Sequence, residues 1–438
     1  MIRTLDLRGS RPTREELLAL IPRNEVDVAS ALDIASDLIT DVRERGSAAL
    51  REQASRLDKV DSYDVRVPQA HIDEAVKALS PELRASLETA ITRVRVGSRA
   101  QVPPAVQTEV APGAVISQRW QPVERVGLYV PGGKAVYPSS VIMNVVPAQV
   151  AGVGSIALAS PPQAHFGGRV HPTILAAAGL LGVSEVYAMG GAGAIGAFAY
   201  GVEDIDLVPV NVVTGPGNVY VAAAKRLVRG RVGIDSEAGP TEILIIADSS
   251  AQPEFVAADL ISQAEHDEMA SAVLVTDSED LAHAVEIQVS LQAQNTAHAE
   301  RVAVALAGSQ SAVVLVDDLS VAVDFSNAYG PEHLEIHTEN SAQLVSEITN
   351  AGAIFVGDYS PVSLGDYSAG SNHVLPTAGQ ALFSSGLGAY TFLRPQQVIE
   401  YNKQALSEVA SGIRLLADDE DLPAHGDAVD IRFNTEDN

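Results

Sequence analysis

The sequence predicts an α/β fold with parallel sheets. Short runs of buried aliphatic residues alternate with longer stretches of helical hydrophobic spacing from about residue 125 to residue 360. Strands that alternate with helices in this way favour a parallel sheet covered on both faces. A hydrophobic content of 46% with only 5% aromatic residues and 34 glycines also fits an α/β enzyme better than a β-sandwich. The length of 438 residues is enough for about three domains.

The first quarter of the chain is predicted to be mainly helical. Residues 1 to about 24 are polar and contain prolines, so we expect a short extension there. Hydrophobic residues recur at helical spacing from residue 27 to about 57. A second helix is predicted from Pro81 to about residue 98, with proline in the first turn, where its missing N–H is no loss. Residues 103–116 show no clear period.

Two series of alternating strands and helices follow. In the first, the predicted strands are 126–130, 155–159, 185–189 and about 205–208, with helices at 139–150, from 172, after 191 and from 217. In the second, the predicted strands are 243–247, 272–276, 312–316 and 353–356, with helices from 253 and up to about 306. From about Pro395 the chain is predicted to be helical again, and an acidic run follows at 418–421.

Composition also limits the function. The formal net charge of −27 argues against a nucleic-acid partner and against an anionic membrane. The first residues lack the apolar core of a secretory signal, and no apolar stretch is long enough to span a bilayer, so we expect a cytoplasmic protein. The chain has no cysteine, which excludes disulfides, zinc–thiolate sites and the thiolate nucleophile of many aldehyde-oxidising enzymes. Any metal must therefore be bound by nitrogen and oxygen ligands.

The segment 262–267, at the end of the helix predicted from Pro253, is a candidate metal site. Asp259, Gln263 and His266 are three or four residues apart, which places them on one side of a helix. An oxygen donor and an imidazole at this spacing can bind a metal between them. On these residues alone, a solvated helix end explains the pattern better, because most polar residues face water.

Two glycine-rich turns are candidates for phosphate binding. Residues 191–196 match G-x-G-x-x-G between a predicted strand and a predicted helix, the context in which glycines let the backbone approach a pyrophosphate. The acidic residue expected about twenty positions later is missing. Residues 215–218, Gly-Pro-Gly-Asn, begin another helix whose N-terminal amides can bind a phosphate. A tight structural turn explains this second motif equally well.

Further candidates lie in the C-terminal half. Glu332 and His333 follow a Gly-Pro turn, and an adjacent pair of this kind can supply an acid and a base. Asp366 and His373 lie in a long polar loop after a strand, where α/β sheets place ligands. The candidates nearest the C-terminus are Glu420 and His425. The remaining histidines, which we expect to be surface or packing residues, are His71, His165, His171, His283, His298 and His337.

Seven segments, in order along the chain, together resemble histidinol dehydrogenases. They are residues 127–133, 215–218, 238–242, 262–267, 331–334, 365–367 with 372–377, and 424–425. The resemblance extends over nearly the whole chain. It implies a zinc-dependent enzyme that oxidises L-histidinol to L-histidine with two NAD⁺, through an aldehyde that stays bound, in the last steps of histidine biosynthesis.

The resemblance also implies roles for the candidate residues. The implied ligands of one zinc ion per subunit are Gln263, His266, Asp366 and His425, and the implied catalytic acid/base pair is Glu332 and His333. The implied substrate contacts are Thr241, Gln263, His266, His333, Asp366, His373, Glu420 and His425. The implied NAD⁺ contacts are Tyr129, Gly193 and Asn218. Two positions depart from the family pattern: Gly193 replaces the usual glutamine, and Thr241 replaces the common serine but keeps the hydroxyl.

The resembling family is an intertwined homodimer of two incomplete Rossmann-like domains with small helical N- and C-terminal segments. The implied division of this chain is an extension at 1–24, a first Rossmann-like domain from 25–128 and 242–383, a second from 129–241, and a C-terminal helical domain at 384–438. The last domain is implied to reach the partner's active site, so Glu420 and His425 are expected to act across the interface.

Three other functions fit parts of the pattern. A related NAD-dependent dehydrogenase on this scaffold would act on another small alcohol. A zinc hydrolase would use zinc-bound water as nucleophile, with Glu332 as base. The two strand–helix series and the glycine-rich turns favour a nucleotide-dependent enzyme over this hydrolase and over a non-catalytic metal-binding protein. Formation of NADH from histidinol and NAD⁺ separates the oxidoreductase from these last two.

Overall fold

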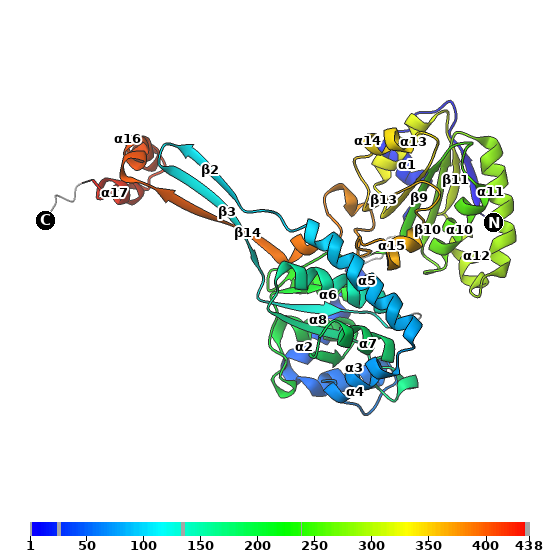
Figure 1. The fold of residues 1–438 in the computed structure, drawn as a ribbon, viewed down its shortest axis with the longest axis horizontal. Helices are drawn as coiled ribbons and strands as arrows, with labels where there is room; N and C mark the ends of the chain where they lie inside the picture. Colours follow the sequence, from blue (N-terminus) through cyan, green and yellow to red (C-terminus); the bar gives the residue numbers. More distant parts are fainter. Residues whose placement is uncertain (1, 24–27, 133–135, 238, 434–438) are drawn as a thin grey trace. The chain divides into compact units, whose positions relative to one another are not determined.

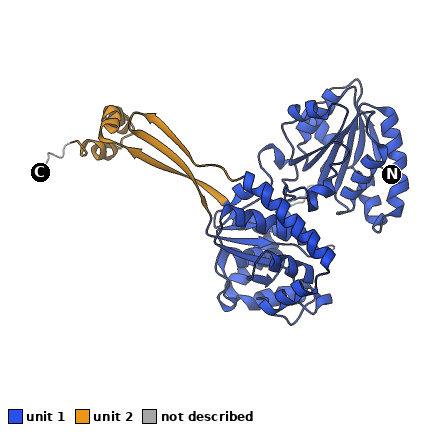
Figure 2. Cartoon of the chain, in the orientation of Figure 1, with its two compact units in different colours: residues 1–101, 123–392 blue, residues 102–122, 393–438 orange. Residues whose placement is uncertain are grey.

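The computed structural model describes residues 2–23, 28–132, 136–237 and 239–433. Parallel sheets flanked by helices (Figure 1) confirm the predicted α/β fold. The chain divides into two compact units, residues 1–101 with 123–392 and residues 102–122 with 393–438 (Figure 2). Predictions that fall on residues 25–27, on Gly133 and on Ala238 lie outside the described residues.

The first unit contains a six-stranded parallel sheet in the order β1-β11-β10-β9-β12-β13. Its strands are β1 (Arg3–Asp6), β9 (Glu242–Ala247), β10 (Ser271–Thr276), β11 (Ala312–Leu315), β12 (His333–His337) and β13 (Ala353–Val356). One face is covered by α10 (Pro253–Ala264), α11 (Glu279–Gln292), α12 (Ala299–Ala307) and α15 (Val362–Tyr367). The other face is covered by α1 (Arg14–Leu20), α13 (Leu319–Tyr329) and α14 (Ser341–Glu347). The four inner strands are therefore buried along their whole length.

The N-terminal residues differ from the predicted extension. Strand β1 pairs in parallel with β11 at one edge of the six-stranded sheet, and α1 packs beside α13 on the same sheet. Only alternate residues of β1 face the protein. A short, half-polar strand is typical of a sheet edge, and its composition resembles that of a loop.

The first unit also contains a five-stranded parallel sheet in the order β6-β5-β4-β7-β8. Its strands are β4 (Arg125–Tyr129), β5 (Ser155–Ser160), β6 (Val186–Ala188), β7 (Val212–Thr214) and β8 (Gly233–Ile234). The helices α2 (Val28–Arg45), α3 (Ser47–Leu57), α8 (Gly191–Tyr200) and α9 (Val219–Val228) share one hydrophobic core with this sheet. The helices α4 (Gln69–Ala78), α5 (Pro81–Ala100), α6 (Pro138–Ala151) and α7 (Pro172–Leu180) pack against one another, with α6 against β4. The strand predicted near 205–208 lies a few residues later in the chain, where it forms β7.

Helices α2 and α3 pack on a different sheet from the one expected. The implied division grouped residues 25–128 with 242–383, whose strands form the six-stranded sheet. Ile39 of α2 and Leu50 of α3 instead lie in the hydrophobic core that contains Val213 of the five-stranded sheet and Phe198 of α8. An amphipathic pattern shows which side of a helix is buried but not which of two sheets buries it.

The second unit is an antiparallel sheet in the order β14-β3-β2, followed by two helices. Its elements are β2 (Val106–Ala111), β3 (Ala114–Pro122), β14 (Leu393–Tyr401), α16 (Lys403–Asp419) and α17 (Pro423–Asp430). The helix predicted from Pro395 is wrong at its start, because β14 pairs with β3 over its whole length. Pro395 is tolerated there because β14 is an edge strand.

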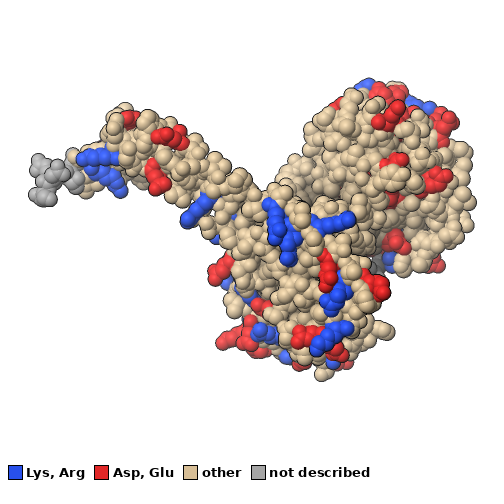
Figure 3. Space-filling view, viewed as in Figure 1, with Lys and Arg blue, Asp and Glu red and all other residues tan. Residues whose placement is uncertain are grey.

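Acidic and basic side chains are interspersed on the face of the molecule that Figure 3 shows, without a continuous basic area. The whole chain carries 56 acidic and 29 basic residues. Among the described helices, none has both the length and the apolar character needed to cross a membrane.

Candidate active site

Several candidate residues of the first unit meet at the amino-terminal edge of the six-stranded sheet. Glu332 and His333 lie where β12 begins, and Thr241 immediately precedes the neighbouring strand β9. Helix α10 runs back along the sheet and brings Gln263 to the same edge. We expected Asp366 at the carboxyl edge, the usual ligand position of an α/β sheet. Instead, α15 leads the chain back from the end of β13 toward the site at the amino-terminal edge.

A chain of hydrogen bonds connects Gln263 to Glu332. Gln263 Nε2 donates to Thr241 Oγ1 (2.6 Å), and this hydroxyl donates to Glu332 Oε2 (2.6 Å). Glu332 Oε2 also accepts from the backbone N–H of Glu242 (3.0 Å). With its Nε2 held by Thr241, the Gln263 amide leaves its Oε1 buried without a hydrogen-bond partner. A buried oxygen without a donor requires an explanation, and a cation ligand is one.

The second member of the acid/base pair is held by a backbone carbonyl. His333 Nδ1 lies 3.0 Å from the carbonyl oxygen of Glu242. Because a carbonyl can only accept, Nδ1 carries the proton of the neutral ring and Nε2 is the basic nitrogen. Glu332 Oε2 lies 3.6 Å from the same Nδ1. Burial raises the pKa of Glu332, and the nearby charge of His333 partly offsets this rise.

A second group of polar side chains surrounds Asp366. His266 Nε2 lies 3.9 Å from Asp366 Oδ2, and His373 Nδ1 lies 3.7 Å from Asp366 Oδ1. His373 Nδ1 donates to the backbone carbonyl of Asp366 (3.1 Å), so its Nε2 accepts from the Ser140 hydroxyl at 3.2 Å. Burial lowers the pKa of His373, although the carboxylate of Asp366 opposes this fall. Positive charge on His266, or on His333 of the first group, lowers the pKa further. The two groups therefore form one cluster.

The loop that follows α15 connects this cluster to the half of the unit that contains the five-stranded sheet. His373 contacts Ser140 of α6, and Asn372 Nδ2 donates to the carbonyl of Met143 on the same helix (2.6 Å). Further along, Thr377 Oγ1 accepts from a backbone N–H just before β9, at 2.6 Å. This loop therefore contacts both halves of the first unit.

The candidate NAD⁺ contacts lie at the carboxyl edge of the five-stranded sheet. The order of the strands reverses between β4 and β7, and α/β sheets bind ligands at such a switch point. Tyr129 ends β4 and Gly215 follows β7, and a Cβ on Gly215 would lie only 1.9 Å from the carbonyl oxygen of Tyr129. The buried Tyr129 hydroxyl accepts from the N–H of Gly191 at the start of α8 (3.1 Å). Asn218 caps the start of α9.

Gln53 fills the space that a side chain at Gly193 would need. A Cβ on Gly193 would lie 2.1 Å from Gln53 Oε1. Gln53 is buried, and its Nε2 donates to the carbonyl of Leu38 (3.0 Å). The glutamine that the resemblance leads one to expect at position 193 therefore does not fit beside Gln53 in this packing.

Gly193→Ala is expected to lower the free energy of unfolding by roughly 1–3 kcal/mol, the usual cost of overpacking a filled core. Urea unfolding measures the change. In a Gln53→Ala background the same substitution should cost less, because the colliding amide is gone. Gly412→Ala is the matched control, since nothing lies within 4 Å of a Cβ at that position. Equal losses in both backgrounds would contradict this account.

Two candidate residues belong to the second unit. Glu420 follows α16 and His425 lies in α17, and both side chains are exposed. Of the four zinc ligands that the resemblance implies, the first unit thus contains Gln263, His266 and Asp366.

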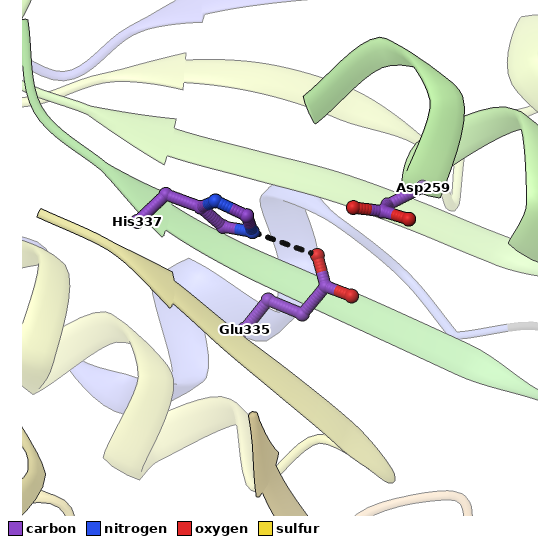
Figure 4. Close-up of side chains that lie close together, drawn as sticks. All are labelled: Asp259, Glu335 and His337. Carbon is purple, nitrogen blue, oxygen red and sulfur yellow. Dashed lines mark hydrogen bonds and ion pairs between the residues drawn. The ribbon is translucent and has the colours of Figure 1, made fainter. Parts of the chain in front are cut away.

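A buried group close to the site was not predicted from the sequence. Asp259, Glu335 and His337 bring their possible ligand atoms within 4.8 Å of one another (Figure 4). His337, which was expected to be a surface or packing residue, is buried and belongs to this group. Alternate residues of a strand face the same side, so the spacing of His333, Glu335 and His337 was the signal that could have revealed this group.

Arg23, which supports the turn before Glu332, was also not predicted to lie near the site. Arg23 Nε lies 2.8 Å from Glu242 Oε1, and both side chains are largely buried. The guanidinium lies 3.9 Å from the centroid of the Tyr329 ring and donates to the backbone carbonyls of Tyr329 and Gly330. Burial raises the pKa of Glu242 to about 7, although the charge of Arg23 opposes the rise. Nothing in the polar N-terminal sequence signals this contact.

Comparison with known proteins gives a consistent result over the whole length. A family model described as histidinol dehydrogenase matches residues 21–433. A histidinol dehydrogenase of Leifsonia xyli subsp. xyli is 66% identical over 99% of both chains, and one of Nocardia farcinica is 57% identical over 98% of this chain and 97% of that protein. The crystal structure of histidinol dehydrogenase from Elizabethkingia anophelis is 34% identical, with a TM-score of 0.93 over 99% of this chain and 98% of that chain.

Proposed function

This chain belongs to the histidinol dehydrogenase family, and on that premise we propose that it oxidises L-histidinol to L-histidine with zinc and two NAD⁺. Family membership establishes an oxidoreductase of histidine biosynthesis that acts on histidinol. The proposal of a zinc- and NAD⁺-dependent reaction is supported by one observation. The Glu332–His333 pair converges with Gln263, His266 and Asp366 at one edge of a sheet.

Zinc fits the donor groups that meet there. Gln263 offers a buried amide oxygen without a hydrogen-bond partner, and His266 and Asp366 approach each other to 3.9 Å. Nitrogen and oxygen ligands of this kind suit zinc, and the proposed set of four is completed by His425. Bound zinc would hold the amine and imidazole of the substrate, which orients the alcohol rather than activating it.

We place NAD⁺ at the switch point of the five-stranded sheet, beside Tyr129, Gly193 and Asn218. The Gly191 N–H at the start of α8 donates to the Tyr129 hydroxyl, so in this proposal the pyrophosphate would bind to the amides that follow in the first turn of the helix. At Gly193 the contribution is limited to the backbone. When bound, NAD⁺ would accept the hydride in each of the two oxidations.

The residues of the pair divide the proton chemistry. His333 Nε2 takes the proton of the hydroxyl, and the carboxylate of Glu332, 3.6 Å from Nδ1, stabilises the imidazolium that results. Without a cysteine in the chain, the aldehyde is most simply oxidised as its hydrate, and Glu332 activates the water that forms it. Burial raises the pKa of Glu332, which makes it a better base at neutral pH. Thr241, His373 and Glu420 complete the proposed substrate contacts.

We further propose a homodimer in which Glu420 and His425 serve the active site of the neighbouring subunit. In support, the second unit exposes large apolar side chains, among them Leu415, Leu416 and Ile431, and exposed apolar patches mark interaction sites. The cytoplasmic location and the lack of a nucleic-acid partner stay predictions from composition.

Zinc-loaded protein is expected to form two NADH per histidinol, and His266→Ala is expected to lose zinc while it remains folded. NADH absorbance, metal analysis and circular dichroism measure the three properties. The exposed His283 provides the control, and His283→Ala should keep both zinc and activity. Full activity of metal-free protein would refute the zinc requirement. Hydrolysis without NADH would favour the zinc hydrolase instead.

His425→Ala and Glu332→Gln proteins, each of which forms little histidine alone, are expected to regain partial formation of histidine when they are unfolded, mixed and refolded together. In a mixed dimer one site receives both substitutions and the other receives neither. Activity is compared with that of each variant refolded by itself. If refolded mixtures that contain heterodimer stay inactive, each chain builds its own site.

A further inference from the structure

The buried group of Asp259, Glu335 and His337 lies between elements that carry the active site (Figure 4). Asp259 is on α10, one helical turn before Gln263. Glu335 is on β12, where it faces the same side as His333. Each of the three side chains belongs to a residue that is at most 9% exposed.

Glu335 also contacts a third element. Its Oε1 accepts from the backbone N–H of Val362, the first residue of α15, at 2.8 Å. Asp366 lies four residues later in the same short helix. One carboxylate therefore connects the strand that carries His333 to the helix that carries a proposed zinc ligand.

Two protons neutralise the group without a metal ion. His337 lies between two carboxylates, with Nε2 at 3.2 Å from Glu335 Oε2 and Nδ1 at 3.6 Å from Asp358 Oδ1, and a charged imidazole has a proton on each nitrogen. Burial opposes this charge, but the hydrogen bond to Glu335 and the surrounding carboxylates outweigh it and raise the pKa of His337. Burial and the charge of Glu335 raise the pKa of Asp259 to about 8. Within the group of three, a neutral acid, a carboxylate and an imidazolium sum to zero, which suits a buried site. The charge of Asp358 is not part of this sum, because its side chain is 40% exposed to water.

We propose that Asp259, Glu335 and His337 are a positioning network, held together by protons, that fixes α10, β12 and α15 relative to one another and so sets the geometry of Gln263 and Asp366. Because the three side chains are buried, they act through these elements and not by contact with substrate. Residues that orient metal ligands in this way typically change metal affinity 10–100-fold when replaced. The predicted effect on zinc rests on the proposed function.

Two substitutions at Asp259 separate the network from a second metal site. Asparagine keeps the shape of the neutral acid and an N–H donor for Glu335, so Asp259→Asn should bind zinc with nearly wild-type affinity and in the same stoichiometry. Leucine has the same branching at Cγ but cannot form a hydrogen bond, so Asp259→Leu should bind zinc 10–100-fold more weakly while circular dichroism shows a folded protein. Zinc alone, in competition with a chelator, is the probe.

Infrared spectroscopy tests the protons directly and needs no zinc. At pH 7 the difference spectrum between wild type and Asp259→Asn should contain the C=O stretch of a buried carboxylic acid. Glu242, whose pKa burial also raises to about 7, contributes equally to both proteins and cancels. Loss of a metal equivalent in Asp259→Asn, unchanged zinc affinity in Asp259→Leu, or absence of the band would overturn the network. If wild type and His266→Ala bind zinc equally poorly, the proposed function fails. In that case two measurements still test the network without zinc: the infrared band, and a thermal midpoint that Asp259→Leu lowers but Asp259→Asn does not. If Asp259→Leu does not fold, the results for Asp259→Asn alone decide whether the network exists.

Discussion

Replacing His333 by alanine is expected to slow the oxidation of histidinol and of added histidinaldehyde alike, each by roughly 10²–10⁴-fold, the usual contribution of general acid–base catalysis. The physical reason is the carbonyl of Glu242, which holds the proton on Nδ1 and leaves Nε2 as the base for both steps. Single-turnover formation of NADH from each substrate measures the two losses. A loss confined to one substrate would mean that the other step uses a different base.

Glu332→Gln should instead impair the aldehyde step more than the alcohol step, because only the hydrate requires an activated water. Glutamine can still accept the two hydrogen bonds from Thr241 and the Glu242 N–H, so the local geometry is retained. Thr241→Ser, which keeps the hydroxyl, is the matched control. Equal damage to both steps would show that Glu332 acts mainly through its 3.6 Å contact with His333.

Arg23→Leu is expected to lower the free energy of unfolding by roughly 3–5 kcal/mol at pH 7, because it leaves one member of a buried ion pair without its partner. Glu242 would then have to take up a proton or remain a buried carboxylate beside Glu332, and the guanidinium would no longer hold the carbonyls of Tyr329 and Gly330. Urea unfolding measures the loss. Arg8→Leu is the control, since Arg8 forms its ion pairs at the surface, where such pairs contribute little.

The loss in Arg23→Leu should grow as the pH rises. Burial raises the pKa of Glu242 from 4.5 to about 7 in the wild-type folded protein, and removal of the Arg23 charge raises it further. Between pH 4.5 and about 7 both folded proteins hold a proton that the unfolded state has released, so both lose stability as the pH rises. Above about 7 the wild-type carboxyl has released its proton, whereas the variant continues to lose stability up to its own higher pKa, so the difference between the two proteins grows there. Adding Glu242→Gln should restore part of the stability at pH 7. A loss independent of pH would assign it to the carbonyl contacts instead.

The regular elements of the first unit were largely predictable from the sequence. Strands such as β9 and β10 are short, uninterrupted apolar runs buried on both faces, and the helices between them leave a parallel arrangement as the simple solution. Strand β14 was not predictable in this way, because its polar residues pair with β3, which lies far away in the sequence. Non-local pairing of this kind has no signature in a local window.

The site was predictable only where short motifs carry it. The resemblance named Glu332, His333 and Gln263 from their neighbours in sequence, and the structure brings them together. Residues whose surroundings come from distant segments were missed. Arg23 reaches Glu242 from a polar N-terminal stretch, and Gln53 occupies the space beside Gly193. Both contacts are products of tertiary packing.

The loop that follows Asp366 has a thermodynamic consequence. Through Asn372 and His373 it is bonded to α6, the helix that follows β4 of the sheet to which we assign NAD⁺. If NAD⁺ shifts α6 against this loop, it changes the affinity for zinc, and zinc must then change the affinity for NAD⁺ by the same factor. Metal and cofactor would be reciprocal effectors within one subunit, and titrating either at fixed concentrations of the other must return one coupling free energy.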